Sequence, residues 1–205
     1  MDHFALLDQP RLPWLDADAL KAAFLRRSAQ EHPDRVHAAT DTERAAATGR
    51  YTELNAAHQC LCEPGPRLLY MLELETGSPP PSVQNIPPET MDLFAEIGLA
   101  CRETDRFLAA KAKAASPLLQ AQFFVQGLER TDNLNALLGR IQLRRQELLA
   151  ELKDMNAAWI AAPPPGSPAR AGALPLRRLE EIARQFTYTA RWCAQIQERI
   201  AQLSF

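Results

Sequence analysis

The sequence contains none of the short motifs that mark common enzyme active sites. It has no glycine-rich phosphate-binding loop, no His-Glu-x-x-His zinc motif and no Gly-x-Ser-x-Gly nucleophile motif. The four histidines are scattered along the chain, and His58 is expected to be a partly buried packing residue of its helix. We therefore expect a protein that is not itself an enzyme and that has no cofactor.

Metal binding is not indicated either. The four cysteines form no Cys-x-x-Cys pair, and Cys60 and Cys62 are too close together for ordinary zinc-ligand spacing. His32 and His37 could share a metal, but no cysteine or third histidine lies near them. We predict reduced thiols and no metal site.

The charge balance and the hydropathy argue against two further classes of protein. The 205 residues include 23 Lys and Arg against 25 Asp and Glu, a formal net charge of −2, so no overall positive field favours nucleic acid. No apolar run approaches the roughly 20 residues that cross a bilayer. The start, Met-Asp-His-Phe, lacks the basic and apolar regions of a secretory signal. We expect a cytoplasmic protein with no nucleic-acid or membrane partner.

The chain does contain many helix-forming residues in helical periodicity. Leu, Ala, Arg, Glu and Gln dominate, and β-branched runs with a period of two are missing. Two proline-rich stretches, 76–88 and 161–175, interrupt the pattern, because proline removes a backbone donor and fixes φ. We predict an all-α protein in which the first stretch is a linker and the second is an exposed helix–helix connection.

The N-terminal 75 residues predict a helical hairpin with short flanking helices. A helix capped by Asp16 or Asp18 ends near Glu31, and Leu20 and Phe24 lie on its apolar side. A second amphipathic helix follows after a short charged loop, and two such helices form an antiparallel hairpin. The predicted helices cover about 3–8, 16–31, 42–61 and 68–74.

The remainder of the chain predicts three or four longer helices in an antiparallel bundle. Apolar residues recur there at spacings of three and four over long segments. Ser116 and Pro117 have the form of an N-cap and a first helical residue. Whether the helix that they begin is separate or continues into the next is left open. The predicted helices cover about 89–113, 118–128, 132–160 and 176–203.

The tripeptide His32-Pro33-Asp34 lies between the two helices of the predicted hairpin. With this context, residues 2–35 and 54–74 resemble the J domain of the HscB family, the co-chaperones of iron–sulfur cluster assembly. The C-terminal region, which ends at Phe205, is similar to that family in its helical arrangement but has few matching residues. The matching positions in the J domain are Asp2, Phe4, Pro10, Leu15, Asp16, Leu20, Phe24, Leu54, Asn55, Leu61, Pro64, Arg67 and Tyr70.

The resemblance implies a J domain at 1–75, a proline-rich linker at 76–88 and a helical client- or scaffold-binding domain at 89–205. J domains dock on a DnaK/HscA-type ATPase chaperone and stimulate its ATP hydrolysis. By resemblance, the Asp34 carboxylate would accept hydrogen bonds from an arginine of that partner, on a turn that Pro33 fixes. The other residues expected to bind the chaperone are His32, Arg35, Lys21, Arg26 and Arg27.

In this family, the first helix of the C-terminal region binds the iron–sulfur scaffold protein through apolar residues flanked by acidic ones. Gly98 and Cys101 stand where acidic residues are expected. Two other interpretations stay open: a J-domain protein whose C-terminal helices bind a different client, and a structural helical interaction protein. The positions that match the scaffold-binding pattern are Leu93, Phe94, Ile97 and Asp105. Leu93 and Ile97 also lie on the apolar stripe of their helix, so core packing and scaffold binding both stay open for them. Phe94 lies off that stripe and is the expected exposed contact.

Overall fold

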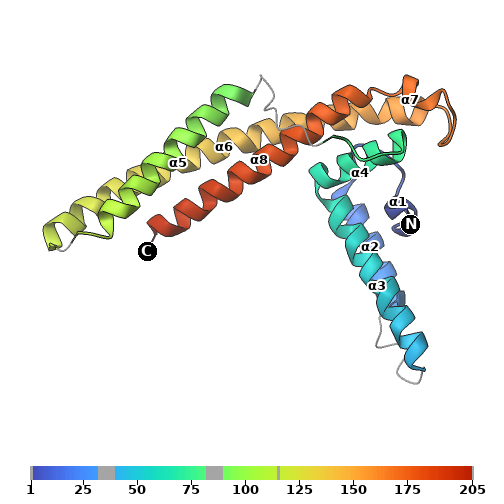
Figure 1. Ribbon diagram of the computed structural model, residues 1–205, viewed down its shortest axis with the longest axis horizontal. Helices are drawn as coiled ribbons and strands as arrows, with labels where there is room; N and C mark the ends of the chain where they lie inside the picture. Colours follow the sequence, from blue (N-terminus) through green and yellow to red (C-terminus); the bar gives the residue numbers. More distant parts are fainter. Residues whose placement is uncertain (1, 32–39, 82–89, 115, 205) are drawn as a thin grey trace. The chain divides into compact units, whose positions relative to one another are not determined.

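The computed structural model describes residues 2–31, 40–81, 90–114 and 116–204 (Figure 1). Every regular element in these ranges is a helix, which confirms the all-α prediction. In the described ranges, no helix has the length and apolar character required to cross a membrane. The helices are α1 (His3–Leu6), α2 (Ala17–Glu31), α3 (Asp41–Cys62), α4 (Pro64–Thr76), α5 (Met91–Lys111), α6 (Pro117–Ala161), α7 (Arg170–Ala173) and α8 (Leu176–Leu203).

The chain divides into two compact units. The first consists of Met1–Ser82 together with Leu149–Ala183, and the second consists of Val83–Leu148 together with Arg184–Phe205. Helices α6 and α8 each contribute residues to both units, because the unit boundaries fall inside them.

The first unit is built around an antiparallel hairpin of α2 and α3, with α1 and α4 packed against α3 (Figure 1). Asp16, one of the two caps that the sequence offers, caps α2 by accepting a hydrogen bond of 2.8 Å from the backbone N–H of Ala19. A capping box of Thr40 and Glu43 begins α3. The interior of the hairpin contains Leu20, Ala23, Ala47, Leu54, Ala57 and Leu61.

Arg67 of α4 joins the segment before α2 to the last turn of α3. Its side chain is buried and donates to the carbonyl oxygens of Pro13, at 3.1 Å, and Leu61, at 2.6 Å. Burial lowers the pKa of this guanidinium to about 10. The charge stays in place at neutral pH because carbonyl acceptors replace the lost water.

The second unit packs α5 against parts of α6 and α8 around one hydrophobic core. The fully buried members of this core come from all three helices, so each apolar stripe that the sequence predicts faces the other two. They include Ile97, Phe107, Leu134, Leu137, Ile141, Trp192 and Ile196.

Helix α6 is continuous over 45 residues, which answers the question that the sequence left open. Ser116 caps its first turn, since the backbone N–H of Leu119 donates to Ser116 Oγ at 3.2 Å. No new helix begins near Thr131, because its hydroxyl does not act as an N-cap. It donates to the carbonyl of Gly127, one turn earlier, at 2.9 Å, and the helix passes through uninterrupted.

The connection between α6 and α8 differs from the exposed segment that the sequence predicts. It contains the short helix α7, and both Arg170 and Leu174 are buried. Burial of Arg170 is possible because its guanidinium pairs with Glu75 of α4 and also donates to the carbonyl of Pro163. The expectation of a wholly exposed connection was therefore wrong at these positions.

Candidate functional site

Two faces of the molecule contain the residues that the sequence singles out, and each lies on one helix. The first face is α2 with the segment that follows it. His32, Pro33, Asp34 and Arg35 are outside the described residues, as is His37. What the structure does describe is the two helix ends between which the tripeptide lies.

An ion pair joins the end of α2 to the middle of α3. Glu31, the last residue of α2, accepts a hydrogen bond of 2.8 Å from Arg50 Nε on α3. On the far side of the tripeptide, the Thr40 N–H donates to the Glu43 carboxylate, and this bond lowers the pKa of that carboxyl group. Residues 32–39 are thus bounded by a fixed helix end on either side.

The three basic residues predicted on α2 have different environments. Arg27 donates to both carboxylate oxygens of Asp8, at 3.0 and 2.6 Å, and Arg26 donates to one of them at 3.4 Å. These bonds lower the pKa of the Asp8 carboxyl and raise that of Arg27. Lys21 is exposed and forms no ion pair among the described residues. The Asp8 carboxylate therefore partly neutralises Arg26 and Arg27, whereas the positive charge of Lys21 has no such neighbour among the described residues.

Leu25 is a residue of this face that the sequence did not single out. Its side chain is 56% exposed, and it lies four residues after Lys21, on the same side of α2. A large apolar side chain next to an unpaired ammonium group suits a contact with both apolar and acidic parts. The sequence could have indicated Leu25 because it is a leucine outside the apolar stripe of Leu20 and Phe24.

Behind this face, aromatic contacts fix the hairpin. Phe24 stacks on His58 with ring centroids 4.1 Å apart, and burial lowers the pKa of that imidazole. This confirms the prediction that His58 is a packing residue. Tyr70 accepts a hydrogen bond of 3.1 Å from the backbone N–H of His3 and stacks on Phe4. Several positions of the family resemblance are thus the framework that supports α2.

The second face is the side of α5 that contains Phe94. Phe94 is 40% exposed and lies 6.0 Å from the ring of Trp192, whereas Ile97 is 1% exposed and belongs to the core. Leu93 is partly buried against the same core. Of the three predicted apolar positions, the structure leaves Phe94 free for contact and places Ile97 where it supports the helix from below.

The predicted acidic position on this face is occupied by a paired carboxylate. Asp105 accepts a hydrogen bond of 2.8 Å from Arg199 of α8, which also donates to the carbonyl of Cys101. A side chain at Gly98 would meet the Arg102 guanidinium, and the Cys101 thiol is buried. The face is therefore apolar with both charge signs at its edge, and Met91, one turn before Phe94, is a further exposed residue on it.

The cysteines show no sign of reactive chemistry. Burial raises the pKa of all four thiols, which disfavours the thiolate form that attacks substrates or binds metals. In the part of the chain that the structure describes, no three His, Cys, Asp or Glu side chains are grouped as metal ligands would be.

We compared the chain with known protein families, curated proteins and solved structures. No family model matches the chain. It is 43% identical over 72 residues to the co-chaperone protein HscB homolog of Paraburkholderia phytofirmans, and this match spans 35% of the chain but only 41% of the relative. A longer match, 30% identical over 150 residues, is found with the HscB homolog of Burkholderia mallei and covers 73% of this chain and 74% of that one.

The fold is also found in a solved structure. The crystal structure of human co-chaperone protein HscB matches with a TM-score of 0.57 at 19% identity, over 98% of this chain and 81% of the human one. At that identity the likeness concerns the fold alone. The long match to the Burkholderia relative identifies this chain as a member of the HscB co-chaperone family.

Proposed function

We propose that this protein is a J-domain co-chaperone that activates a DnaK/HscA-type ATPase and delivers an iron–sulfur scaffold protein to it. The observation that carries the proposal is the position of His32-Pro33-Asp34, directly after the last residue of α2 and before the capping box of α3. The protein would act through its partner's catalytic site, consistent with the co-chaperone names of its relatives.

The first face would bind the chaperone. Asp34 would offer a carboxylate to an arginine of the ATPase domain, and Pro33 would restrict the backbone that presents it. Lys21 and Leu25 would add a charged and an apolar contact from the neighbouring helix, with Arg26 and Arg35 at its edge. Charge complementarity of this kind favours fast and transient association, which suits a partner that must be released after each ATP cycle.

The second face would bind the scaffold protein. Phe94 and Met91 give an exposed apolar surface on α5, and the buried Ile97 holds that helix to the core. Asp105 would mark the acidic edge of this surface. The proposed assignment is residues 1–75 for the chaperone, 76–88 as a linker and 89–205 for the scaffold, with Leu149–Ala183 packed in the same compact unit as the N-terminal residues.

Single-turnover ATP hydrolysis by a DnaK/HscA-type chaperone tests the first half of the proposal. The wild-type protein should accelerate hydrolysis. Asp34→Asn should lose roughly tenfold or more of this effect, because a hydrogen bond to a charged group contributes about 1.5–3 kcal/mol. Asp41→Asn is the matched control, since Asp41 is an exposed carboxylate at the start of α3 that pairs with Arg44 of its own helix. Equal stimulation by wild type and Asp34→Asn would refute the proposal.

Binding of the purified scaffold protein tests the second half. Phe94→Ala should weaken binding, whereas Leu99→Ala should not, because Leu99 is similarly exposed on α5 but points away from the Phe94 face. Arg102 beside Gly98 gives this face a positive edge where the family pattern expects acidic residues. If ATPase stimulation is normal while the scaffold fails to bind at micromolar concentrations, the C-terminal helices serve a different client.

A further inference from the structure

The first part of α6 carries a row of exposed apolar side chains on the side that faces away from the core. Leu118, Val125 and Leu128 are 72%, 56% and 53% exposed, and Ala121 is exposed between them. The four residues are spaced by three, four and three, so they form a single stripe of the kind found at coiled-coil seams. We call these four residues the α6 seam.

The same face of the helix changes character abruptly after Leu128. Continuing the spacing of three and four along α6 gives positions that are polar or small, and all of them are exposed. The helix therefore has a continuous apolar outer face only over its first three turns, and Leu143, which is 58% exposed, is an isolated apolar residue further along the same face. The continuing positions are Asp132, Asn135, Gly139 and Gln142.

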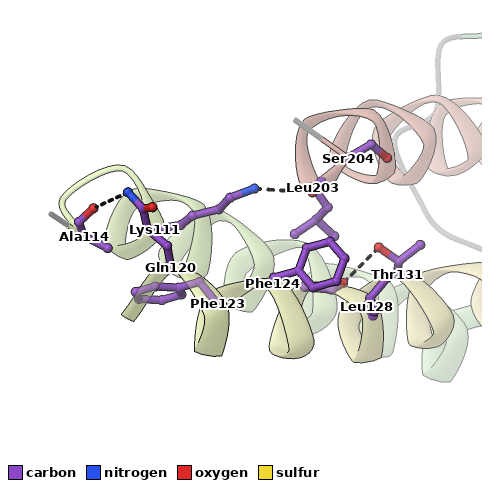
Figure 2. A pocket seen from close by; sticks show the side chains of 10 residues that line it. Lys111, Ala114, Gln120, Phe123, Phe124, Leu128, Thr131, Leu203 and Ser204 are labelled. Atoms are coloured by element: carbon purple, nitrogen blue, oxygen red, sulfur yellow. Dashed lines mark hydrogen bonds between the residues drawn. The ribbon is translucent and has the colours of Figure 1, made fainter. Parts of the chain in front are cut away.

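The third helix of the bundle does not cover this region. Helix α8 ends at Leu203, where Lys111 Nζ lies 3.4 Å from the Leu203 carbonyl oxygen, and the α5–α6 hairpin continues beyond that point (Figure 1). A groove of about 710 Å³ lies at the end of α8. Figure 2 shows Phe124 and Leu128 among the side chains that line it. Phe124 is 67% exposed and extends the apolar surface from the seam toward this groove.

We propose that the α6 seam is a homodimer interface, in which it pairs antiparallel with the same seam of a second copy of this chain. The spacing of three, four and three is the same from either end of the seam. In one antiparallel register, two-fold symmetry therefore places every seam residue opposite a seam residue of the second copy. In that register Leu118 meets Leu128 of the second copy, and Ala121 meets Val125 of the second copy. A large residue faces a smaller one at the central pair, as close helix packing requires.

The charges at the ends of the seam agree with this register. Antiparallel pairing brings the start of one seam, which the exposed Lys113 precedes, to the end of the other seam, which the exposed Asp132 follows, and the symmetry repeats this at the other end. No charged residue lies within the seam itself, so no like charges oppose each other. A second copy thus satisfies both the apolar face and its charged boundary.

The size of the surface sets the expected affinity. An exposed apolar patch of a few hundred Å² is typical of interaction sites, whereas a standard stable interface buries about 800 Å² on each partner. The four seam residues and Phe124 are far fewer than the roughly 20–30 residues that each partner contributes to a standard interface. The dimer should therefore dissociate in the micromolar range and should be visible only as a dependence of mass on concentration.

Sedimentation equilibrium of the full-length protein tests the proposal. The wild-type mass should rise from 22.9 kDa toward twice that value as the concentration increases through the micromolar range. Val125→Glu should weaken association at least about tenfold, because it places an unpaired carboxylate at the centre of the seam. Gln142→Glu is the matched control: it adds the same charge on the same face of α6, outside the seam, and should dimerise normally.

A cross-link tests the register separately. The single variants Ala121→Cys and Val125→Cys, mixed and oxidised, should form a mixed 121–125 disulfide in preference to either homodisulfide, because only that pair is opposed. Peptide mapping distinguishes it from links through the native thiols. A wild-type protein that stays monomeric at several hundred micromolar overturns the proposal. So does a dimer that Val125→Glu and Gln142→Glu affect equally, or one that forms no 121–125 link.

Discussion

Arg170 and Glu75 form a bidentate ion pair across 95 positions of sequence. Arg170 Nε and Nη2 lie 2.7 and 2.9 Å from the two carboxylate oxygens of Glu75, and the two side chains are only 8% and 2% exposed. A third donor of the same guanidinium binds the carbonyl of Pro163 at 2.6 Å. This pair fixes the connection between α6 and α8 to the last turn of α4 within the first unit.

Loss of either partner should destabilise the first unit strongly. Arg170→Met leaves the Glu75 carboxylate buried and unpaired, so we expect a loss of about 3–5 kcal/mol in the free energy of unfolding. Urea unfolding followed by circular dichroism measures it. Arg44→Met, which breaks the exposed pair with Asp41, should cost less than about 1 kcal/mol. Similar losses in the two variants would show that burial does not strengthen the Arg170 pair.

The longer helices could be predicted from the sequence because prolines, glycines and capping residues mark most of their ends, whereas the short α7 was not predicted. Ser116 and Pro117 predict the start of α6, and the predicted span of the last helix, 176–203, is the observed α8. The ion-pair partners of the charged side chains could not be predicted from the sequence. Arg27 finds Asp8 19 residues away, and Arg170 finds Glu75 95 residues away, so only the folded chain brings these groups together.

The candidate site was predicted to a similar extent. The sequence pointed to Phe94 as the exposed member of the α5 set, and the structure leaves it exposed while placing Ile97 in the core. It could not indicate Leu25 or Met91, because whether an apolar residue outside the core stripe is covered depends on neighbouring helices. The roles of His32, Pro33 and Asp34 stay predictions, since those residues lie outside the described part of the chain.

Arg67 should resist replacement by lysine. Its guanidinium reaches the carbonyls of both Pro13 and Leu61, and a single ammonium group on a flexible stem cannot hold both in the same geometry. We expect Arg67→Lys to destabilise the protein by about 1–3 kcal/mol, because one buried acceptor loses its donor. Urea unfolding measures this change. A loss no larger than that of Lys21→Arg on the exposed face of α2 would contradict it.

The stability of the first unit should fall as the solution is acidified below neutral pH. Burial lowers the pKa of His58 in the folded state, so the unfolded chain binds the proton more readily below pH 6.5. Stability contributed by the neutral imidazole is complete above pH 6.5 and is lost as pH falls toward the lowered value. His3 shifts in the same direction.

His58→Phe is the variant that isolates this contribution. It keeps an aromatic ring against Phe24 but cannot be protonated, so the drop in unfolding free energy between pH 7.5 and 5.5 should be smaller than in wild type. The difference should be a fraction of a kcal/mol, because the imidazole is partly exposed to water. Urea titrations at the two pH values measure it, and an unchanged pH dependence would show that His58 does not contribute.

The ion pair between Glu31 and Arg50 should affect chaperone activation more than it affects stability. The pair is exposed, so Glu31→Gln should cost less than about 1 kcal/mol in unfolding free energy. Under the proposed function, however, Glu31 directly precedes the tripeptide, and releasing it from α3 lets that end of α2 move. Single-turnover ATPase stimulation should therefore fall severalfold, whereas Asp41→Asn, which neutralises an exposed carboxylate at the start of α3, should leave it intact. Arg50→Gln should reduce stimulation as Glu31→Gln does, and the double variant should be no worse than either single one. Additive losses would mean that the two residues act independently and that the pair does not position the tripeptide.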